Sequence, residues 1–393
     1  MAPLRNMRQK ALITATTGAL AVLAALVSAP VFPAQAAAAD ERPLLVTLGD
    51  SFISGEAGRW AGNSNESAAG HAGTDRAWDP QTRASDPHTV YGATYDDGCN
   101  RSDSAEVHSA PGADRRVNLA CSGATSTAIL LPENGGRPFK GQPSQAEQLQ
   151  LTAGGHPVHA VVLSVGGNDL GFSDIISTCA KNFAKPGFLA SPCSPTQAKE
   201  VDKRLPAMRA AVTAAVRDVR TAMTRVGHPV GSYRLILQSA PSPLPDAARI
   251  RYPGDKYDRL YTGGCPFFDK DLTWAHEELG PAVSSSLARV AQEQRTEFLD
   301  LSHAFDGREV CSDTTSQVGE GKRPSGVRSE WVRFTTSGLG QGQRQESLHP
   351  NYYGQLALGT CLGLVLERRP SAYRCDNIPG QSPQSMTVQP AGS

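Results

Sequence analysis

One stretch near the start of the chain decides the fold. Residues 44–48 read LLVTL, an apolar run typical of a buried strand, and residues 49–55, GDSFISG, follow directly. The pattern predicts a sharp strand-to-helix turn that lifts the hydroxyl of Ser51 clear of the sheet edge and points the next backbone N–H groups at the same spot. Ser51 is therefore the candidate nucleophile. A Gly-Asp-Ser triplet alone is ordinary turn chemistry, so the assignment depends on partners elsewhere in the chain.

Strand and helix patterns alternate along the rest of the chain. The run AVVLSV at residues 160–165 predicts a central strand that is covered on both faces. Shorter strands are predicted at 117–120, 233–237 and 297–301, the last in the chain, and helices at 196–226, 278–294 and 351–367. The alternation predicts an α/β fold, a doubly wound, mostly parallel sheet with helices on both faces. Residues 55–100 are predicted to be a long ordered loop with short helical pieces, pinned at Cys99.

The two ends of the chain differ from its middle. Three basic residues precede an apolar run at 11–32 and a small-residue cleavage site at 34–36, so residues 1–39 are predicted to be a signal peptide. The competing interpretation is a single membrane anchor, because about 20 apolar residues can span a bilayer. Residues 40–376 are predicted to form the catalytic domain. Residues 377–393, with an excess of Pro, Gly, Gln and Ser, are predicted to be a disordered tail.

The charge balance excludes one class of partner. The chain has 38 basic and 38 acidic residues, and removing residues 1–39 takes away three basic residues and no acidic one, which leaves a net charge of about −3. No local run of Lys and Arg supplies the basic stripe that binding to a phosphate backbone requires. We therefore expect no nucleic-acid partner.

Four sequence blocks carry a family resemblance. They are Gly49-Asp50-Ser51, Cys121-Ser122-Gly123-Ala124, Gly166-Gly167-Asn168-Asp169 and His349-Pro350-Asn351. In this order they resemble the blocks of the SGNH (GDSL-type) hydrolases, in particular the secreted actinobacterial lipases and esterases. The resemblance covers most of the chain after the signal peptide and implies the SGNH-hydrolase, flavodoxin-like fold with disulfide-pinned loop insertions.

The resemblance also implies an activity. It predicts a secreted serine carboxylic ester hydrolase (a lipase, phospholipase or broad esterase) that acts through an acyl-serine intermediate without a cofactor or metal. The expected protein is a monomer that binds a small-molecule or lipid ester and has no membrane anchor after cleavage of the signal peptide. The alternative within enzymes is an O-deacylase of carbohydrates or natural products, or an acyltransferase on the same fold. A catalytically inactive binding module is a third hypothesis. It would require a missing nucleophile, base or oxyanion donor, and none is missing.

The resemblance assigns roles that physical chemistry supports. His349 would accept the Ser51 proton and return it to the leaving alkoxide, since histidine is suited to this near neutral pH. Pro350 is expected in the first turn of the following helix, which puts His349 at or beside its cap. The oxyanion donors would be the backbone N–H groups of Ser51 and Gly123 and the side-chain amide of Asn168. Asp169 is expected to cap the following helix rather than take part in the chemistry.

The chain departs from the family pattern at one position. These hydrolases usually place an aspartate three residues before the histidine, and this chain has Glu346 there. Glu346 is the candidate third member of the triad, because a glutamate can also orient an imidazole. In some relatives a backbone carbonyl of the same loop does this instead. Asp50 is a poor substitute, since it neighbours the nucleophile and would have to reach the far nitrogen of the ring.

Eight cysteines follow the signal peptide. An even number in a secreted chain indicates four disulfides, which residue spacing alone leaves with 105 pairings. The family pattern implies pairing between neighbours for the first three pairs and leaves the last two cysteines to tie down the C-terminus. The expected pairs are Cys99–Cys121, Cys179–Cys193, Cys265–Cys311 and Cys361–Cys375. A metal site is a poor alternative, because there is no Cys-x-x-Cys and the histidines lack ligand spacing.

Overall fold

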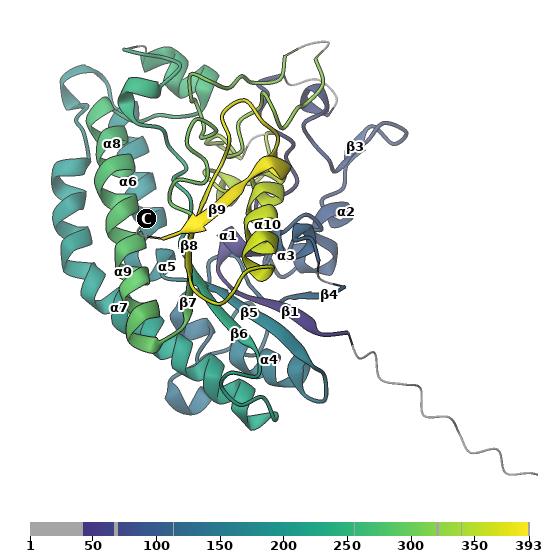
Figure 1. Ribbon diagram of the computed structural model, residues 1–393. Coiled ribbons are helices and arrows are strands. Elements are labelled where there is room, and N and C mark those ends of the chain that lie inside the picture. The colour runs from purple at the N-terminus through teal and green to yellow at the C-terminus, as the bar shows by residue number, and fades with distance from the viewer. Residues whose placement is uncertain are drawn as a thin grey trace, which may run out of the picture. The chain divides into compact units, whose positions relative to one another are not determined.

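The computed structural model describes residues 42–391, except 67–69, 113, 255, 320–321 and 339. The predicted signal peptide lies outside the described residues. The main sheet has the strand order β4-β1-β5-β6-β7-β8-β9, in which all neighbours are parallel except β8 and β9 (Figure 1). Its strands are β1 (Leu44–Gly49), β4 (Arg115–Asn118), β5 (Val158–Ser164), β6 (Arg234–Gln238), β7 (Glu297–Asp300), β8 (Ala372–Asp376) and β9 (Thr387–Pro390).

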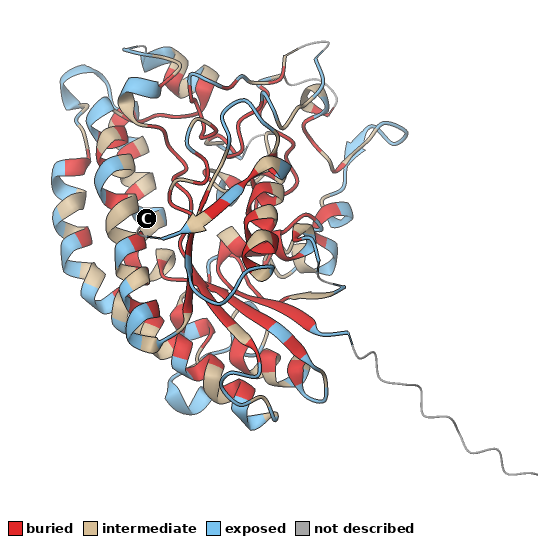
Figure 2. Ribbon diagram, in the orientation of Figure 1, coloured by how far each residue is buried: buried red, intermediate tan, exposed pale blue. Residues whose placement is uncertain are grey.

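The helices cover both faces of this sheet, so the predicted doubly wound α/β fold is confirmed. They are α1 (Ser51–Ser54), α2 (His88–Tyr91), α3 (Glu106–Ser109), α4 (Gln145–Ala153), α5 (Gly167–Leu170), α6 (Phe172–Ala184), α7 (Ser194–Arg225), α8 (Asp269–Trp274), α9 (Gly280–Gln294) and α10 (Tyr352–Leu366). Helix α7 packs against α4 and α9, and α10 packs against α3 (Figure 1). The strands are mostly buried, whereas α7 turns an exposed face outward (Figure 2).

The core explains the apolar sequence of the central strands. β1 lies between β4 and β5, and all its residues are buried. Along α7 the buried residues recur three and four positions apart from Met208 onward, at Met208, Val212, Val216 and Val219, and Val201 lies two turns earlier, which is the spacing of one helix face. Burial of a strand on both faces favours a continuous apolar run over an alternating one.

The predicted long loop at 55–100 is ordered. It contains a small hairpin, β2 (Trp78–Asp79) with β3 (Ala84–Ser85), together with α2 and short 3₁₀ turns. Trp60 is fully buried within it. The disulfide Cys99–Cys121 ties its end to the segment that follows β4. A long insertion of this kind stays ordered because side chains and a covalent link pin it.

Three expectations for the C-terminal part are wrong. β7 is not the last strand, because β8 and β9 follow. The predicted disordered tail forms β9, which pairs antiparallel with β8. Met386, just before β9, and Val388 within it are buried, so apolar residues and an open sheet edge outweigh the polar composition of the tail. The N-cap of α10 is Asn351, whose Oδ1 accepts from the N–H groups of the first turn. Pro350 therefore lies outside the helix.

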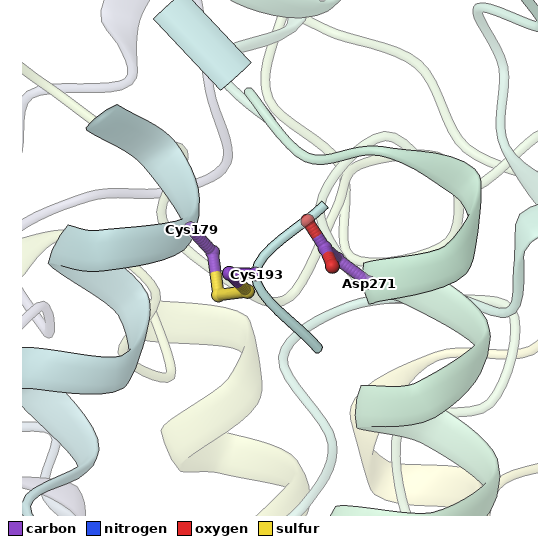
Figure 3. A group of neighbouring side chains, drawn as sticks. All are labelled: Cys179, Cys193 and Asp271. Carbon is purple, nitrogen blue, oxygen red and sulfur yellow. A yellow bond between two sulfur atoms is a disulfide. The ribbon is translucent and has the colours of Figure 1, made fainter. Parts of the chain in front are cut away.

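The four expected disulfides are all present. Figure 3 shows Cys179–Cys193, which joins α6 to the start of α7, beside Asp271. The Asp271 carboxylate accepts from the N–H of Ser194 at 2.9 Å, at the N-terminus of α7. Although these three side chains lie close together, both thiols are consumed by the disulfide, so the group cannot hold a metal through thiolates.

No helix in the described ranges is long and apolar enough to cross a membrane.

Candidate active site

The turn that carries Ser51 is fixed by its own residues. Gly49 has φ +143, and a Cβ there would lie 1.9 Å from the carbonyl oxygen of Ser164 on the neighbouring strand, so only glycine fits. Asp50 caps α1, its Oδ1 accepting from the N–H of Phe52 at 3.1 Å. Ser51 is then the first residue of the helix, and its N–H is one of those without an intrahelical acceptor.

The structure brings Ser51 and His349 together. Nε2 of His349 lies 2.6 Å from Oγ of Ser51. The other ring nitrogen, Nδ1, lies 3.0 Å from the carbonyl oxygen of Ser347. Because a carbonyl can only accept, Nδ1 carries a proton and Nε2 of the neutral ring is free to accept from the serine hydroxyl. The ring of Phe52 packs beside the imidazole, with centroids 4.9 Å apart.

The expected contact between Glu346 and His349 is not made, so this expectation is corrected. The Glu346 carboxylate accepts from Nε1 of Trp60 at 3.0 Å, the hydroxyl of Tyr91 at 2.9 Å and the N–H of Gln343 at 2.7 Å. These donors come from the 55–100 loop and from its own turn, and they draw the carboxylate away from the imidazole. The structure instead has the alternative arrangement, in which a backbone carbonyl of the same loop, that of Ser347, accepts from Nδ1 of His349.

Distant contacts hold the loop that carries His349. The N–H of Leu348 donates to the carbonyl of Arg333 at 2.8 Å, and the N–H of Arg333 donates to the carbonyl of His349 at 2.9 Å. Leu348 has φ +59, a left-handed conformation that is strained for a branched residue and persists where surrounding contacts impose it. Arg333 is fully buried, and its guanidinium lies 3.7 Å from the ring centroid of Trp60.

The three candidate oxyanion donors come from three segments. Asn168, in α5, lines the same cavity as Ser51, and one N–H of its amide donates to the carbonyl of Ala124 at 2.9 Å. That bond ties the third block to the second and leaves the other amide N–H available. Gly123 has φ +83 and is exposed in the turn after Cys121. Among the described residues no acceptor takes its N–H.

Asp50, which precedes Ser51 in the chain, lies near a second acidic residue, Asp169. Burial and the nearby charge of Asp169 raise the pKa of Asp50 to about 7. Asp169 was expected to cap the helix that follows it, and this is wrong. It lies inside α5, and its carboxylate accepts from the N–H of Ser126 at 3.1 Å and from the hydroxyl of Ser126 at 3.1 Å. Asp169 therefore fastens the segment after the second block.

Burial also changes the basicity of the candidate base. It lowers the pKa of His349 to about 4, and the carbonyl of Ser347 opposes this effect. The imidazole is therefore neutral at pH 7, the state in which it can accept a proton.

Ser51 and His349 line a cavity of about 900 Å³. This volume lies at the upper end of the range for small-molecule pockets, about 300–1,000 Å³. Ser51, Asn168 and His349 contribute polar groups to its lining. Most other walls are apolar and come from α6, α8, α9 and neighbouring loops; they include Phe172, Ile176, Leu244, Phe267, Trp274 and Leu287.

A second group with metal-ligand chemistry lies outside this cavity. Ligand atoms of His276, Asp306 and Glu309 lie within 4.8 Å of one another. Asp306 also pairs with Nδ1 of His303 at 3.0 Å. Burial raises the pKa of Glu309 to about 8, so a metal ion that bound there at pH 7 would have to displace a proton. The expected absence of a metal stays a prediction.

Sequence reasoning missed the side chains that anchor the histidine loop. Trp60 and Tyr91 lie in the predicted loop at 55–100, to which no part of the site was assigned, yet both donate to Glu346. Ser347 contributes only a backbone carbonyl, which no residue type reveals. The spacing of the blocks contains no signal for any of the three.

The chain is similar to known proteins both in a family profile and among solved structures. Residues 47–357 match the profile of the GDSL-like Lipase/Acylhydrolase family. Among solved structures, the chain is similar to an extracellular lipase from Streptomyces rimosus (18% identity, 82% of this chain and 98% of that chain, TM-score 0.43). It is also similar to phospholipase A1 from Streptomyces albidoflavus NA297 (17%, 83% and 100%, TM-score 0.47) and to an aryl esterase from M. smegmatis (15%, 83% and 98%, TM-score 0.34).

No curated protein sequence matches this chain. The family profile, by contrast, extends from the β1 strand that leads into Ser51 to a point beyond His349, so it includes all four blocks. The chain therefore belongs to the GDSL-like lipase/acylhydrolase family and is a carboxylic ester hydrolase.

Proposed function

We propose that this protein is a secreted lipase or phospholipase that hydrolyses esters of long-chain acyl groups through an acyl-serine intermediate. The observation that carries the proposal is the 2.6 Å contact between Oγ of Ser51 and Nε2 of His349, at the wall of a mostly apolar cavity of about 900 Å³. A weak hydroxyl nucleophile needs an adjacent base, and an acyl chain needs a dry, apolar space.

In the first half of the reaction, Oγ of Ser51 attacks the ester carbonyl carbon while Nε2 of His349 takes the hydroxyl proton. The carbonyl π electrons move to the oxygen, which the N–H groups of Ser51 and Gly123 and the amide of Asn168 stabilise. The tetrahedral intermediate then collapses, the bond to the alkoxide breaks, and His349 gives its proton to the leaving alcohol. An acyl group remains on Ser51.

In the second half, a water molecule gives a proton to Nε2 of His349 and attacks the acyl carbon. Collapse releases the carboxylic acid and returns the proton to Oγ of Ser51. Throughout, the carbonyl of Ser347 accepts from Nδ1 of His349 and stabilises the imidazolium, the role that a carboxylate has in a Ser-His-Asp triad. On this proposal the chain uses a Ser-His dyad with a backbone orienter, and Glu346 positions the loop.

The cavity supports a long acyl group over a short one. Its lining runs along α6 from Phe172 to Lys181, which corresponds to about 13 Å of helix. It continues past Trp274 to Leu287 on α9. An acetyl group would leave most of this apolar surface without a partner. Binding should therefore become more favourable by about 0.8 kcal/mol with each added methylene.

Secretion is supported by the covalent frame. Four disulfides persist in oxidising environments and are rare in the cytosol. The basic and apolar segments at the start of the chain have the pattern of a signal peptide. Expression of the full chain, with mass measurement of the protein in the medium, tests this. Protein that keeps residues 1–39 and stays in the membrane fraction would contradict it.

A panel of chromogenic esters from acetyl to palmitoyl, with triglyceride, phospholipid and acetylated sugars, tests the activity. We expect kcat/KM to rise with chain length, no effect of chelator, and no turnover by Ser51→Ala. Predominant cleavage of acetylated sugars would favour the O-deacylase instead. Folded protein that cleaves no ester at all would refute the proposal.

A further inference from the structure

Four large apolar side chains are exposed on two neighbouring segments. Phe188 is 96% exposed and Leu189 54%, both in the turn after α6, while Tyr257 is 69% and Tyr261 65% exposed near a π-helical turn at Asp258–Gly263. We refer to Phe188, Leu189, Tyr257 and Tyr261 as the rim cluster. Single exposed apolar residues are ordinary, but four of this size on adjacent segments require an explanation.

Direct contacts hold the two segments together. Nζ of Lys256 donates to the carbonyl of Lys185 at 2.6 Å and lies 5.5 Å from the ring centroid of Phe183. The ring of Phe183 in turn packs on Phe268, with centroids 4.9 Å apart. The rings of Tyr257 and Tyr261 pack on each other at 5.0 Å. The rim cluster therefore belongs to one anchored surface rather than to two independent loops.

This surface adjoins the cavity of the candidate active site. Tyr261 and Leu260 line that cavity from one segment, and Ala180 and Lys181 line it from the last part of α6. Because Tyr261 is both a lining residue and largely exposed, the cavity reaches the molecular surface beside the rim cluster. An acyl chain that enters there would pass these side chains.

The segment that carries Phe188 is basic, although Asp174 and Glu200 flank it and Asp258 follows Tyr257 on the other segment. Residues 175–199 contain no acidic residue and three lysines, Lys181, Lys185 and Lys199, all of them exposed. Tyrosine rings lie favourably at the boundary between headgroups and acyl chains, and phenylalanine contributes buried apolar area there. Lysines are attracted to the negative potential of an anionic lipid surface.

We propose that the rim cluster docks the protein on the surface of an anionic phospholipid aggregate, with the mouth of the cavity facing the lipid. This inference rests on the proposed function, since it supplies the route by which an acyl chain leaves the aggregate for Ser51. In the docked protein the acyl chain passes directly from the lipid aggregate into the apolar cavity, so little of its apolar surface is exposed to water.

The experiment measures binding of Ser51→Ala protein to vesicles, so that hydrolysis does not interfere. Vesicles of phosphatidylglycerol and of phosphatidylcholine are compared by co-sedimentation. We expect binding to the anionic vesicles, and at least tenfold weaker binding after Phe188→Asp or Tyr257→Asp. Matched controls are Leu151→Asp and Val230→Asp, which change side chains 81% and 68% exposed outside the rim cluster and should leave binding unchanged.

The outcomes separate docking from catalysis. With Ser51 intact, Phe188→Asp should cleave a soluble short-chain ester at the wild-type rate but hydrolyse vesicle phospholipid at least tenfold more slowly. Equal vesicle binding by rim and control variants, or no binding by any protein, overturns the docking proposal. Self-association in light scattering that Phe188→Asp abolishes would assign the surface to a second copy instead. Vesicle binding without cleavage of any ester would refute the proposed function and leave the docking surface standing.

Discussion

The turn that carries Ser51 and the loop that carries His349 meet at 2.6 Å, but different forces fix them. The turn is determined locally: a central strand ends, Gly49 permits the sharp bend, and Asp50 caps the helix that follows. The loop depends on Arg333 and on the 55–100 insertion, which supplies Trp60. A nucleophile can therefore be encoded in seven adjacent residues, whereas the position of its base is distributed over the chain.

The largest effect is expected when Ser51 or His349 itself is replaced. Ser51→Ala and His349→Ala should each lower kcat by about a millionfold, and the double variant should be no worse, because the two residues act as one unit. Steady-state kinetics of the three variants on one soluble ester measure this. Additive losses would mean that turn and loop contribute independently and would contradict the dyad.

The second largest effect is expected for Asn168, whose bond to Ala124 links the third sequence block to the second. Asn168→Ala should raise the barrier by about 2.7–4 kcal/mol, a hundredfold to thousandfold loss in kcat, because one oxyanion donor disappears. Circular dichroism and thermal unfolding serve as controls for the lost bond to Ala124. A loss below tenfold in folded protein would remove Asn168 from the oxyanion site.

Glu346→Gln distinguishes orientation through a carboxylate from support of the loop. The carboxylate of Glu346 accepts from Trp60, Tyr91 and Gln343. In the Gln variant the amide NH₂ would face one of these donors, and that hydrogen bond would be lost. We therefore expect the free energy of unfolding, measured with denaturant, to fall by about 1–3 kcal/mol. Turnover should fall less than tenfold. A loss near ten-thousandfold with unchanged stability would restore Glu346 to the triad.

The smallest effect is a displaced pH profile. Because burial lowers the pKa of His349 to about 4, the base stays neutral as the pH falls from 7 to 5, and kcat/KM should halve only near pH 4. The pH dependence on a soluble ester, with stability checked at each pH, measures this. An acid limb centred near 6.5 would show that the imidazole is as solvated as a free histidine and that the loop holds it loosely.

The contrast between the locally fixed Ser51 turn and the His349 loop, which distant residues hold, also explains which features could be predicted from the sequence. Five strands of the main sheet (β1, β4, β5, β6 and β7), the Ser51 turn and the disulfide pairs were predictable, because continuous apolar runs and family blocks report on neighbours in sequence. The partner of Nδ1 was not determined, because the choice between Glu346 and a backbone carbonyl depends on where Trp60 and Tyr91 lie, some 250 to 290 residues earlier. The C-terminal tail was mistaken for disorder because its composition hides two inward-facing residues, Met386 and Val388.

That tail has a practical consequence for anyone who shortens the gene. Ending the chain at Asp376 would remove β9 and leave β8 as an unpaired edge. An open edge offers its backbone N–H and C=O groups to any other extended chain and is a template for aggregation. The short β9, which ends in Pro390, is a poorer template. Residues 377–391 therefore act as a solubility element, and a purification tag is better joined after them than in their place.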